Sequence, residues 1–205
     1  MLSRGLMALI LMRIVALCGT AAIAGYGIGM RFHMIILMPA FVLGNVAATM
    51  VGQNLGSGRP DRSRSAAWMA TGMDVVIMAA SAALMLAFAP QFVRLFDANP
   101  EVVRVGAGYL RTVSPFYVFV ALAIVLGRAL DGAGQTMITM IFTVSILWGL
   151  QVPLAMFLSR VAQPATQGIW WAIGIAMTVH ALLVTGWFLT GRWKTHPVDI
   201  LRLPV

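Results

Sequence analysis

Six long apolar stretches, separated by short polar breaks, make up most of this chain of 205 residues. The stretches cover residues 2–17, 32–55, 65–89, 106–130, 138–158 and 169–189. A helix that crosses a bilayer needs roughly 20 apolar residues, and every stretch except the first is that long. The pattern predicts an all-α integral membrane protein, a bundle of six transmembrane helices in which the first helix is truncated.

The breaks contain residues that turn the chain or end helices. Glycines are frequent in residues 19–29, which predicts a loose connection between the first two helices. Further polar connections fall at residues 97–101, 131–135 and 163–167. Proline interrupts helices, so we expect a kink at Pro39 and the end of the third helix at Pro90. The fourth and fifth predicted helices also contain a proline, at Pro115 and Pro153.

Composition agrees with the membrane prediction. Hydrophobic residues are 60% of the chain, charged residues are 10%, and the mean hydropathy is +0.91. Soluble domains have about 45–50% apolar and about 25% charged residues. The net charge of +8 is scattered over the ends of the segments, which argues against a nucleic-acid partner. The lone Cys18 excludes an internal disulfide.

The densest positive charge lies in the break at residues 52–64, which carries three arginines and two turn glycines. This break reads as a short hairpin between two membrane helices. Its end of the bundle holds eight lysines and arginines, against five at the other end, so we expect it to be cytoplasmic. Ser57 is then inside and Asn99 outside. Residues 1–191 form one membrane lobe in a multi-pass protein of the cell membrane, and residues 192–205 form a short basic cytoplasmic tail.

Polar residues at helical spacing mark candidate working faces. Asn45, Thr49 and Gln53 are four residues apart and share one face of the second helix. The fifth helix carries Thr139, Thr143 and Gln151 in the same way, and Ser114 and Tyr117 share a face of the fourth. Such faces avoid lipid, so they either form hydrogen bonds between helices, worth about 0.6–2 kcal/mol each, or line a watery cavity. The sequence leaves both uses open.

Asp74 is the only acid well inside an apolar stretch. Thr71 and Ser81 share its helix face, so its carboxyl group need not meet lipid. An acid inside the membrane is by default a functional hypothesis, here a site that binds a proton or a cation.

Three methionines, Met30, Met34 and Met38, form a stripe at four-residue spacing. Flexible thioethers suit a surface that accepts ligands of many shapes. They also fill gaps in ordinary apolar packing, which is the blander interpretation.

No catalytic, metal or cofactor motif is recognisable. His33, His180 and His196 lie on different segments without metal-ligand spacing, and they read as packed or interfacial histidines. The glycines of the 25–29 stretch do not follow a strand and lack the dinucleotide-binding spacing, which favours close helix packing or a flexible connection. The chain contains no pair of acids and no nucleophile beside a base that would indicate an enzyme.

Two motifs resemble a transporter family. Residues 51–64 (VGQNLGSGRPDRSR) resemble the loop between the second and third helices of a lobe in MATE (multidrug and toxic compound extrusion) transporters. Residues 24–31 (AGYGIGMR) resemble the stretch just upstream in one subgroup. The resemblance covers nearly all of the chain, and it matches only the second, C-terminal, of the family's two six-helix lobes.

The resemblance implies a function. The chain would form half of a V-shaped cavity and export organic cations or amphipathic drugs in exchange for sodium or protons. Its partner would be the N-terminal lobe or a second copy, and the Asn45–Thr49–Gln53 face would border the cavity, with Tyr117 and Gln151 as further pathway candidates. In the family the first helix begins further upstream.

One departure concerns ion coupling. A sodium-coupled subgroup has an acid four residues beyond an aromatic on the fourth helix, and a glutamate on the first. Here Ala121 follows Tyr117 at that spacing, and the first helix has no acid. Coupling would then reside in the other lobe or use Asp74.

Two other readings compete with drug export. A flippase for lipid-linked precursors, from the same superfamily, would be expected to have more basic residues inside its helices than Arg13 alone. A membrane fragment that assembles with a partner without transporting anything is the third reading.

Overall fold

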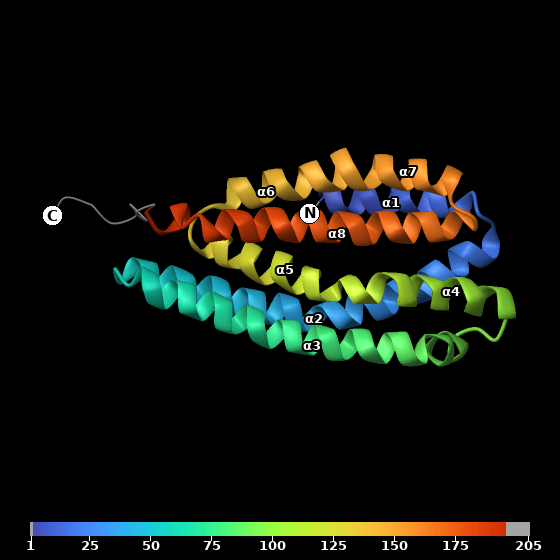
Figure 1. Cartoon of the computed structure of the whole chain (residues 1–205), viewed down its shortest axis with the longest axis horizontal. Coiled ribbons are helices and arrows are strands. Elements are labelled where there is room, and N and C mark those ends of the chain that lie inside the picture. Colours follow the sequence, from blue (N-terminus) through green and yellow to red (C-terminus); the bar gives the residue numbers. More distant parts are fainter. Residues whose placement is uncertain (1, 196–205) are drawn as a thin grey trace.

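The structure, a computed structural model, describes residues 2–195, with side chains placed for residues 9–194. Helices joined by short turns make up the described chain, and no strand occurs within it. Five helical segments are long and apolar enough to cross a membrane, and a shorter helix precedes them (Figure 1). The predicted all-α bundle of six membrane helices is confirmed. Most of the predicted tail, residues 196–205, lies outside the described residues.

The elements follow in chain order. The first three segments are single helices, α1 (Leu2–Ala16), α2 (Thr20–Gly56) and α3 (Pro60–Arg94). The fourth consists of α4 (Pro100–Val113), the 3-10 turn η1 (Ser114–Phe116) and α5 (Tyr117–Gly132). The fifth consists of α6 (Thr136–Val144), the π-helix η2 (Ser145–Gln151) and α7 (Val152–Val161). The last are α8 (Ala165–Leu189) and the 3-10 turn η3 (Arg192–Thr195).

The bundle has two halves. One half holds α2, α3, α4 and α5, and the other holds α1, α6, α7 and α8 (Figure 1). Contacts between α5 and α8 join the halves. The α2–α3 hairpin, the α5–α6 turn and the C-terminal end of α8 share one end of the bundle, whereas the α1–α2, α3–α4 and α7–α8 turns share the other (Figure 1).

The prediction of a loose connection over residues 19–29 was wrong. The break is only three residues, Leu17 to Gly19, and α2 begins at Thr20. Glycine permits two helices to approach closely when it faces the neighbour. A Cβ atom added to Gly25 would lie 2.8 Å from the backbone nitrogen of Gly106 on α4, and one added to Gly29 would overlap the ring of Tyr109. These glycines therefore serve close helix packing.

The prediction that the third helix ends at Pro90 was also wrong. Helix α3 continues through Pro90 to Arg94, because Ala89 and Val93 are fully buried and hold the last turn against the bundle. Helix α4 begins at Pro100, six residues before the predicted start, with the side chain of Asn99 accepting a hydrogen bond from the Glu101 N–H. Proline fits the first turn of a helix, where its missing N–H is not needed.

The fifth segment is not one regular helix. A π-helix of seven residues separates α6 from α7, and Pro153 is the second residue of α7. Proline removes one backbone hydrogen bond and crowds the preceding turn, which favours such a local widening. The sequence shows the proline but not the π-helix.

The start of the tail packs against the bundle. The indole of Trp193 is fully buried, stacks on Phe188 with ring centres 4.7 Å apart, and donates a hydrogen bond to the Phe188 carbonyl. Lys194 lies 3.0 Å from the carboxylate of Asp61 at the start of α3. These contacts tie residues 192–194 to the end of the bundle that carries the α2–α3 hairpin.

Candidate functional site

A cleft runs between the two halves of the bundle. Its first part, which we call the inner chamber, has a volume of about 270 Å³ and is lined by α1, α2, α4, α5, α6, η2 and α8. Its second part, the polar chamber, has a volume of about 420 Å³ and lies among α2, α5, α6 and α8. Five residues line both chambers, so the cleft is continuous: Phe41, Ala123, Ile124, Thr143 and His180.

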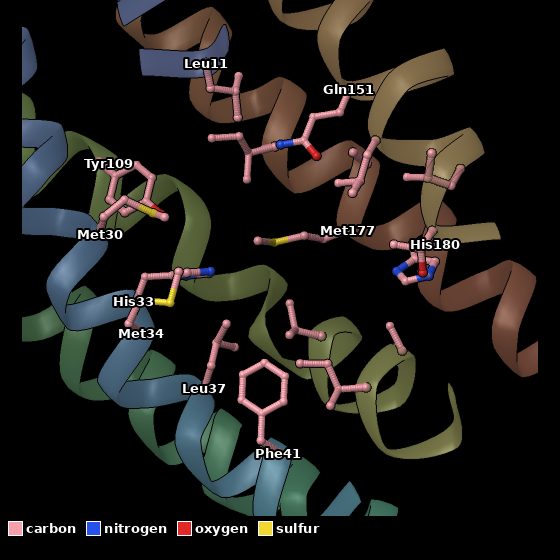
Figure 2. Close-up of a pocket in the computed structure, with 18 of the residues that line it drawn as sticks. Leu11, Met30, His33, Met34, Leu37, Phe41, Tyr109, Gln151, Met177 and His180 are labelled. Atoms are coloured by element: carbon pink, nitrogen blue, oxygen red, sulfur yellow. Dashed lines mark hydrogen bonds between the residues drawn. The ribbon is translucent and has the colours of Figure 1, made fainter. Parts of the chain in front are cut away.

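The inner chamber is mostly apolar, with polar groups on facing walls. Met30, His33 and Met34 project from α2, and Met177 and His180 project from α8 across from them (Figure 2). The methionine stripe predicted on α2 thus contributes two of its three members to the lining, whereas Met38 is 64% exposed. Flexible thioethers on two walls suit ligands of varied shape.

Aromatic rings close one side of the inner chamber. The hydroxyl of Tyr117 lies 3.2 Å from Nδ1 of His33. Tyr26 stacks on Trp170 with ring centres 5.3 Å apart, and Tyr109 meets both rings edge-on. The Tyr109 hydroxyl donates to the sulfur of Met30 at 3.5 Å. These ring contacts pack Tyr26, Tyr109 and Trp170 against one another on this side of the chamber.

The polar chamber contains the charged groups of the cleft. Arg128 and Asp131 form an ion pair at 3.8 Å on the last turn of α5. The hydroxyl of Thr139 donates to the Asp131 carboxylate at 2.5 Å. One turn further along α6, Thr143 lies 3.5 Å from Nε2 of His180 on α8. Polar groups thus line this chamber from the α5–α6 turn inward.

The residues predicted on the fifth helix do share one side. Thr139 and Thr143 line the polar chamber, and Thr143 and the buried Gln151 line the inner chamber. Tyr117 is fully buried and reaches the inner chamber only through His33. The structure therefore groups these candidates around the cleft.

Asn45, Thr49 and Gln53 lie elsewhere. All three are exposed on α2, and the Thr49 hydroxyl donates to the Asn45 carbonyl at 3.0 Å. They do not line the cleft. Their common face is confirmed, and none of the three makes a side-chain hydrogen bond to another helix among the described residues. The stripe therefore does not hold this bundle together.

Asp74 lies apart from the cleft and from the exposed face of α2, at a buried position of α3. Its side chain is fully buried, and neither carboxylate oxygen has a hydrogen-bond partner among the described residues. The same holds for the hydroxyl of Ser114 on η1, an element that packs against α3. An unpaired buried carboxyl group is costly, which makes Asp74 a candidate functional residue.

The sequence did not identify the polar chamber. Asp131 reads as part of a turn, and His180 as an isolated histidine on an apolar helix. The only signal in the sequence was the spacing of Thr139 and Thr143, and their partners come from α5 and α8. No group of three or more His, Cys, Asp or Glu side chains within the described range has the arrangement of a metal site.

Comparisons with known proteins give one consistent result. A family model described as MatE matches residues 1–157. The chain is 23% identical over 185 residues to the "Probable multidrug resistance protein NorM" of Thermotoga maritima, covering 90% of this chain and 40% of that protein. It is 28% identical over 191 residues to the "Probable multidrug resistance protein YpnP" of Bacillus subtilis, covering 93% of this chain and 42% of that protein.

Solved structures agree with the sequence relatives. A MATE crystal structure in the bent conformation superposes with a TM-score of 0.85 at 22% identity, covering 94% of this chain and 42% of the other. An outward-facing MATE transporter superposes with a TM-score of 0.84 at 21% identity. At this identity the likeness shows the fold. The chain spans about two fifths of the length of the relatives that it matches.

Proposed function

The chain belongs to the MATE family of transporters, and we propose that it is the C-terminal lobe of a multidrug antiporter. The observation that carries the proposal is the extent of the match. Nearly all of this chain, with its six helical segments, superposes on a MATE transporter, and it covers only about 42% of that transporter. A six-helix unit of that share corresponds to one of two lobes, and the other lobe or a second copy would complete the cavity.

The proposed substrates are organic cations or amphipathic drugs. Two features of the described residues support this class. The inner chamber combines methionines with the rings of Tyr26 and Tyr109, which attract cations through their π-systems. Relatives of the chain are named multidrug resistance proteins. The few charges of the cleft lie in the polar chamber, where Arg128 and Asp131 offset each other.

We place the drug pathway on the exposed face of α2. Asn45, Thr49 and Gln53 form a polar stripe on an apolar helix, and within the described residues no side chain of the stripe hydrogen-bonds to another helix. Polar groups facing lipid are unfavourable, so the stripe is better placed against a watery cavity between two lobes. Gln151 and the His33-linked Tyr117 lie deeper, at the inner chamber beside α2.

The double variant Asn45→Ala/Thr49→Ala tests this placement in a complete two-lobed transporter that contains this sequence. We expect drug efflux per molecule to fall several-fold, with unchanged abundance and melting temperature, because the stripe is exposed. Ser81→Ala on α3 is the matched control, since the Ser81 hydroxyl makes the same bond to a carbonyl of its own helix. Unchanged efflux per molecule in the double variant would remove this face from the pathway.

Ion coupling is proposed to use Asp74, in exchange for sodium or protons. The support is its burial without a hydrogen-bond partner among the described residues. A carboxyl group that is held away from water and from partners gains much from binding a proton or a cation, which is what coupling requires.

The proposed orientation places the tail and the α2–α3 hairpin in the cytoplasm. The hairpin carries Arg59, Arg62 and Arg64, and positive charge collects on the cytoplasmic side. Single cysteines at Ser57 and Asn99, in a Cys18→Ser background, test it by labelling intact cells with an impermeant maleimide. We expect label at position 99 alone, and label at position 57 alone would reverse the orientation.

A further inference from the structure

A row of polar side chains leads into the cleft from the end of the bundle that carries the tail. The Asp131 carboxylate accepts a hydrogen bond from Thr139, and the Thr143 hydroxyl donates to the Thr139 carbonyl at 2.8 Å. Because that hydroxyl is used as a donor, its oxygen is the acceptor for the Nε2–H of His180, 3.5 Å away. The row therefore reaches the imidazole ring of His180.

His180 occupies the junction of the two chambers. It lines both, as does Thr143, and it faces the inner chamber opposite His33 and Met34 (Figure 2). Asp131, by contrast, lines only the polar chamber and lies in the last turn of α5, next to the α5–α6 turn. The row thus connects an acid near the bundle end to a histidine beside the inner chamber.

We propose that the polar chamber is a proton-uptake site, in which Asp131 admits protons and His180 holds them next to the inner chamber. The inference rests on the proposed antiport function and deepens it, because it selects the proton as an ion bound by this lobe. The site is separate from Asp74, which lines neither chamber.

The donor set of the chamber favours a proton over sodium. Sodium needs several oxygen ligands and negative charge, but the Asp131 carboxylate is paired with Arg128 at 3.8 Å. The other titratable groups that line the cleft are His33 on α2, from the opposite wall, and the hydroxyls of Tyr26 and Tyr109. An imidazole exchanges a proton near neutral pH, and a paired carboxylate assists the exchange without holding a metal cation.

Water is needed to complete the path, because the row passes through the backbone carbonyl of Thr139. The polar chamber has a volume of about 420 Å³. A water molecule takes about 30 Å³ in the liquid, so the chamber has room for a short chain of waters between hydroxyl and ring. Such a chain would carry protons past the carbonyl to His180.

The test is the titration of His180 in the purified chain, reconstituted in lipid nanodiscs. With ¹⁵N-labelled histidine, NMR spectra from pH 5 to 9 follow each ring, and His180→Gln, His33→Gln and His196→Gln assign the signals. If His180→Gln does not fold, the other two assign its signal by elimination. We expect the His180 ring to titrate in this range, and a ring that does not change from pH 5 to 9 would overturn the proposal.

Two further arms test the role of Asp131 and the identity of the ion. Asp131→Asn should move the midpoint of the His180 ring, since it removes the charge at the start of the row. Glu101→Gln, which removes an exposed carboxylate at the other end of the bundle, should not change it. An unmoved midpoint in Asp131→Asn, or a midpoint that shifts when sodium replaces choline, would contradict the assignment. Since no arm measures drug export, failure here would leave the proposed function standing.

Discussion

The two sides of the cleft are built differently. On one side, α5 alone has nine buried residues, and it packs against α2, α3 and α8. On the other side, none of the residues of α6 is buried, and α7 buries only Ala155. The π-helix between them buries two residues, Ile146 and Gln151. The first side is a scaffold, whereas the second, the α6–η2–α7 wall, leaves most of its residues unburied within this lobe and packs mainly along α8.

This difference has a functional meaning. Regions that move are drawn from the weakly packed parts of a protein, and π-helices are frequent at functional sites. The wall carries Thr139, Thr143 and Gln151, three of the polar groups that line the cleft. A change in the scaffold should therefore unfold the lobe, while a change in the wall should alter transport with the fold preserved.

The largest effect is expected where α2 and α5 cross. A Cβ atom at Gly132 would overlap the backbone of Ala48, including its carbonyl oxygen. Gly132→Val should destabilise the lobe by about 3 kcal/mol or more, because the overlap is with backbone that cannot turn aside. Thermal unfolding of the purified chain measures this.

Gly72→Ala is a control at a glycine that faces open space. It lies on the exposed side of α3, where an added Cβ would meet no atom within 4 Å. It should leave the melting temperature unchanged or raise it, since alanine favours a helix by up to about 1 kcal/mol. Equal loss of stability in both variants would mean that the crossing is not close.

A smaller effect is expected at Asp74, in transport. Asp74→Asn keeps the size of the buried side chain and removes its charge. In the complete transporter we expect export to slow by about tenfold, which corresponds to about 1.4 kcal/mol of barrier. Asp97→Asn, in the exposed α3–α4 turn, is the control acid. Normal export by Asp74→Asn would show that this carboxyl group plays no part in coupling.

The smallest effect is expected in the wall. Pro153→Ala returns an N–H to the turn after the π-helix and should favour a regular helix there. We expect export to slow a few-fold with a slightly raised melting temperature. Pro90→Ala makes the same replacement in the last turn of α3, on the scaffold, and should leave export unchanged. Equal export by the two variants would argue against a functional π-helix.

Local patterns predicted much of this molecule. The lengths of the apolar stretches predicted the six membrane segments, and the arginine-rich stretch at residues 52–64 predicted the α2–α3 hairpin. The polar spacing gave the common face of Asn45, Thr49 and Gln53. These features depend only on residues that are close in sequence, so they can be read directly from the chain.

Features that depend on a neighbouring helix could not be read in this way. The glycines at positions 25 and 29 are compatible with close helix packing or with a flexible connection, and only the position of α4 beside them decides for packing. The π-helix η2 was missed for a related reason, since a proline is compatible with several local distortions. The polar chamber joins α5, α6 and α8, so His180 gained a possible role only when Thr143 was placed beside it.

The central claim is that this chain is one lobe of a two-lobed exporter. The most direct test is dye efflux from cells that lack their own efflux pumps, comparing this chain alone with the same chain joined to an N-terminal MATE lobe. Membrane abundance is matched by quantitative blotting. We predict energy-dependent loss of dye only from cells with the joined protein. Energy-dependent efflux by the chain alone would contradict the claim and indicate a working assembly of identical copies.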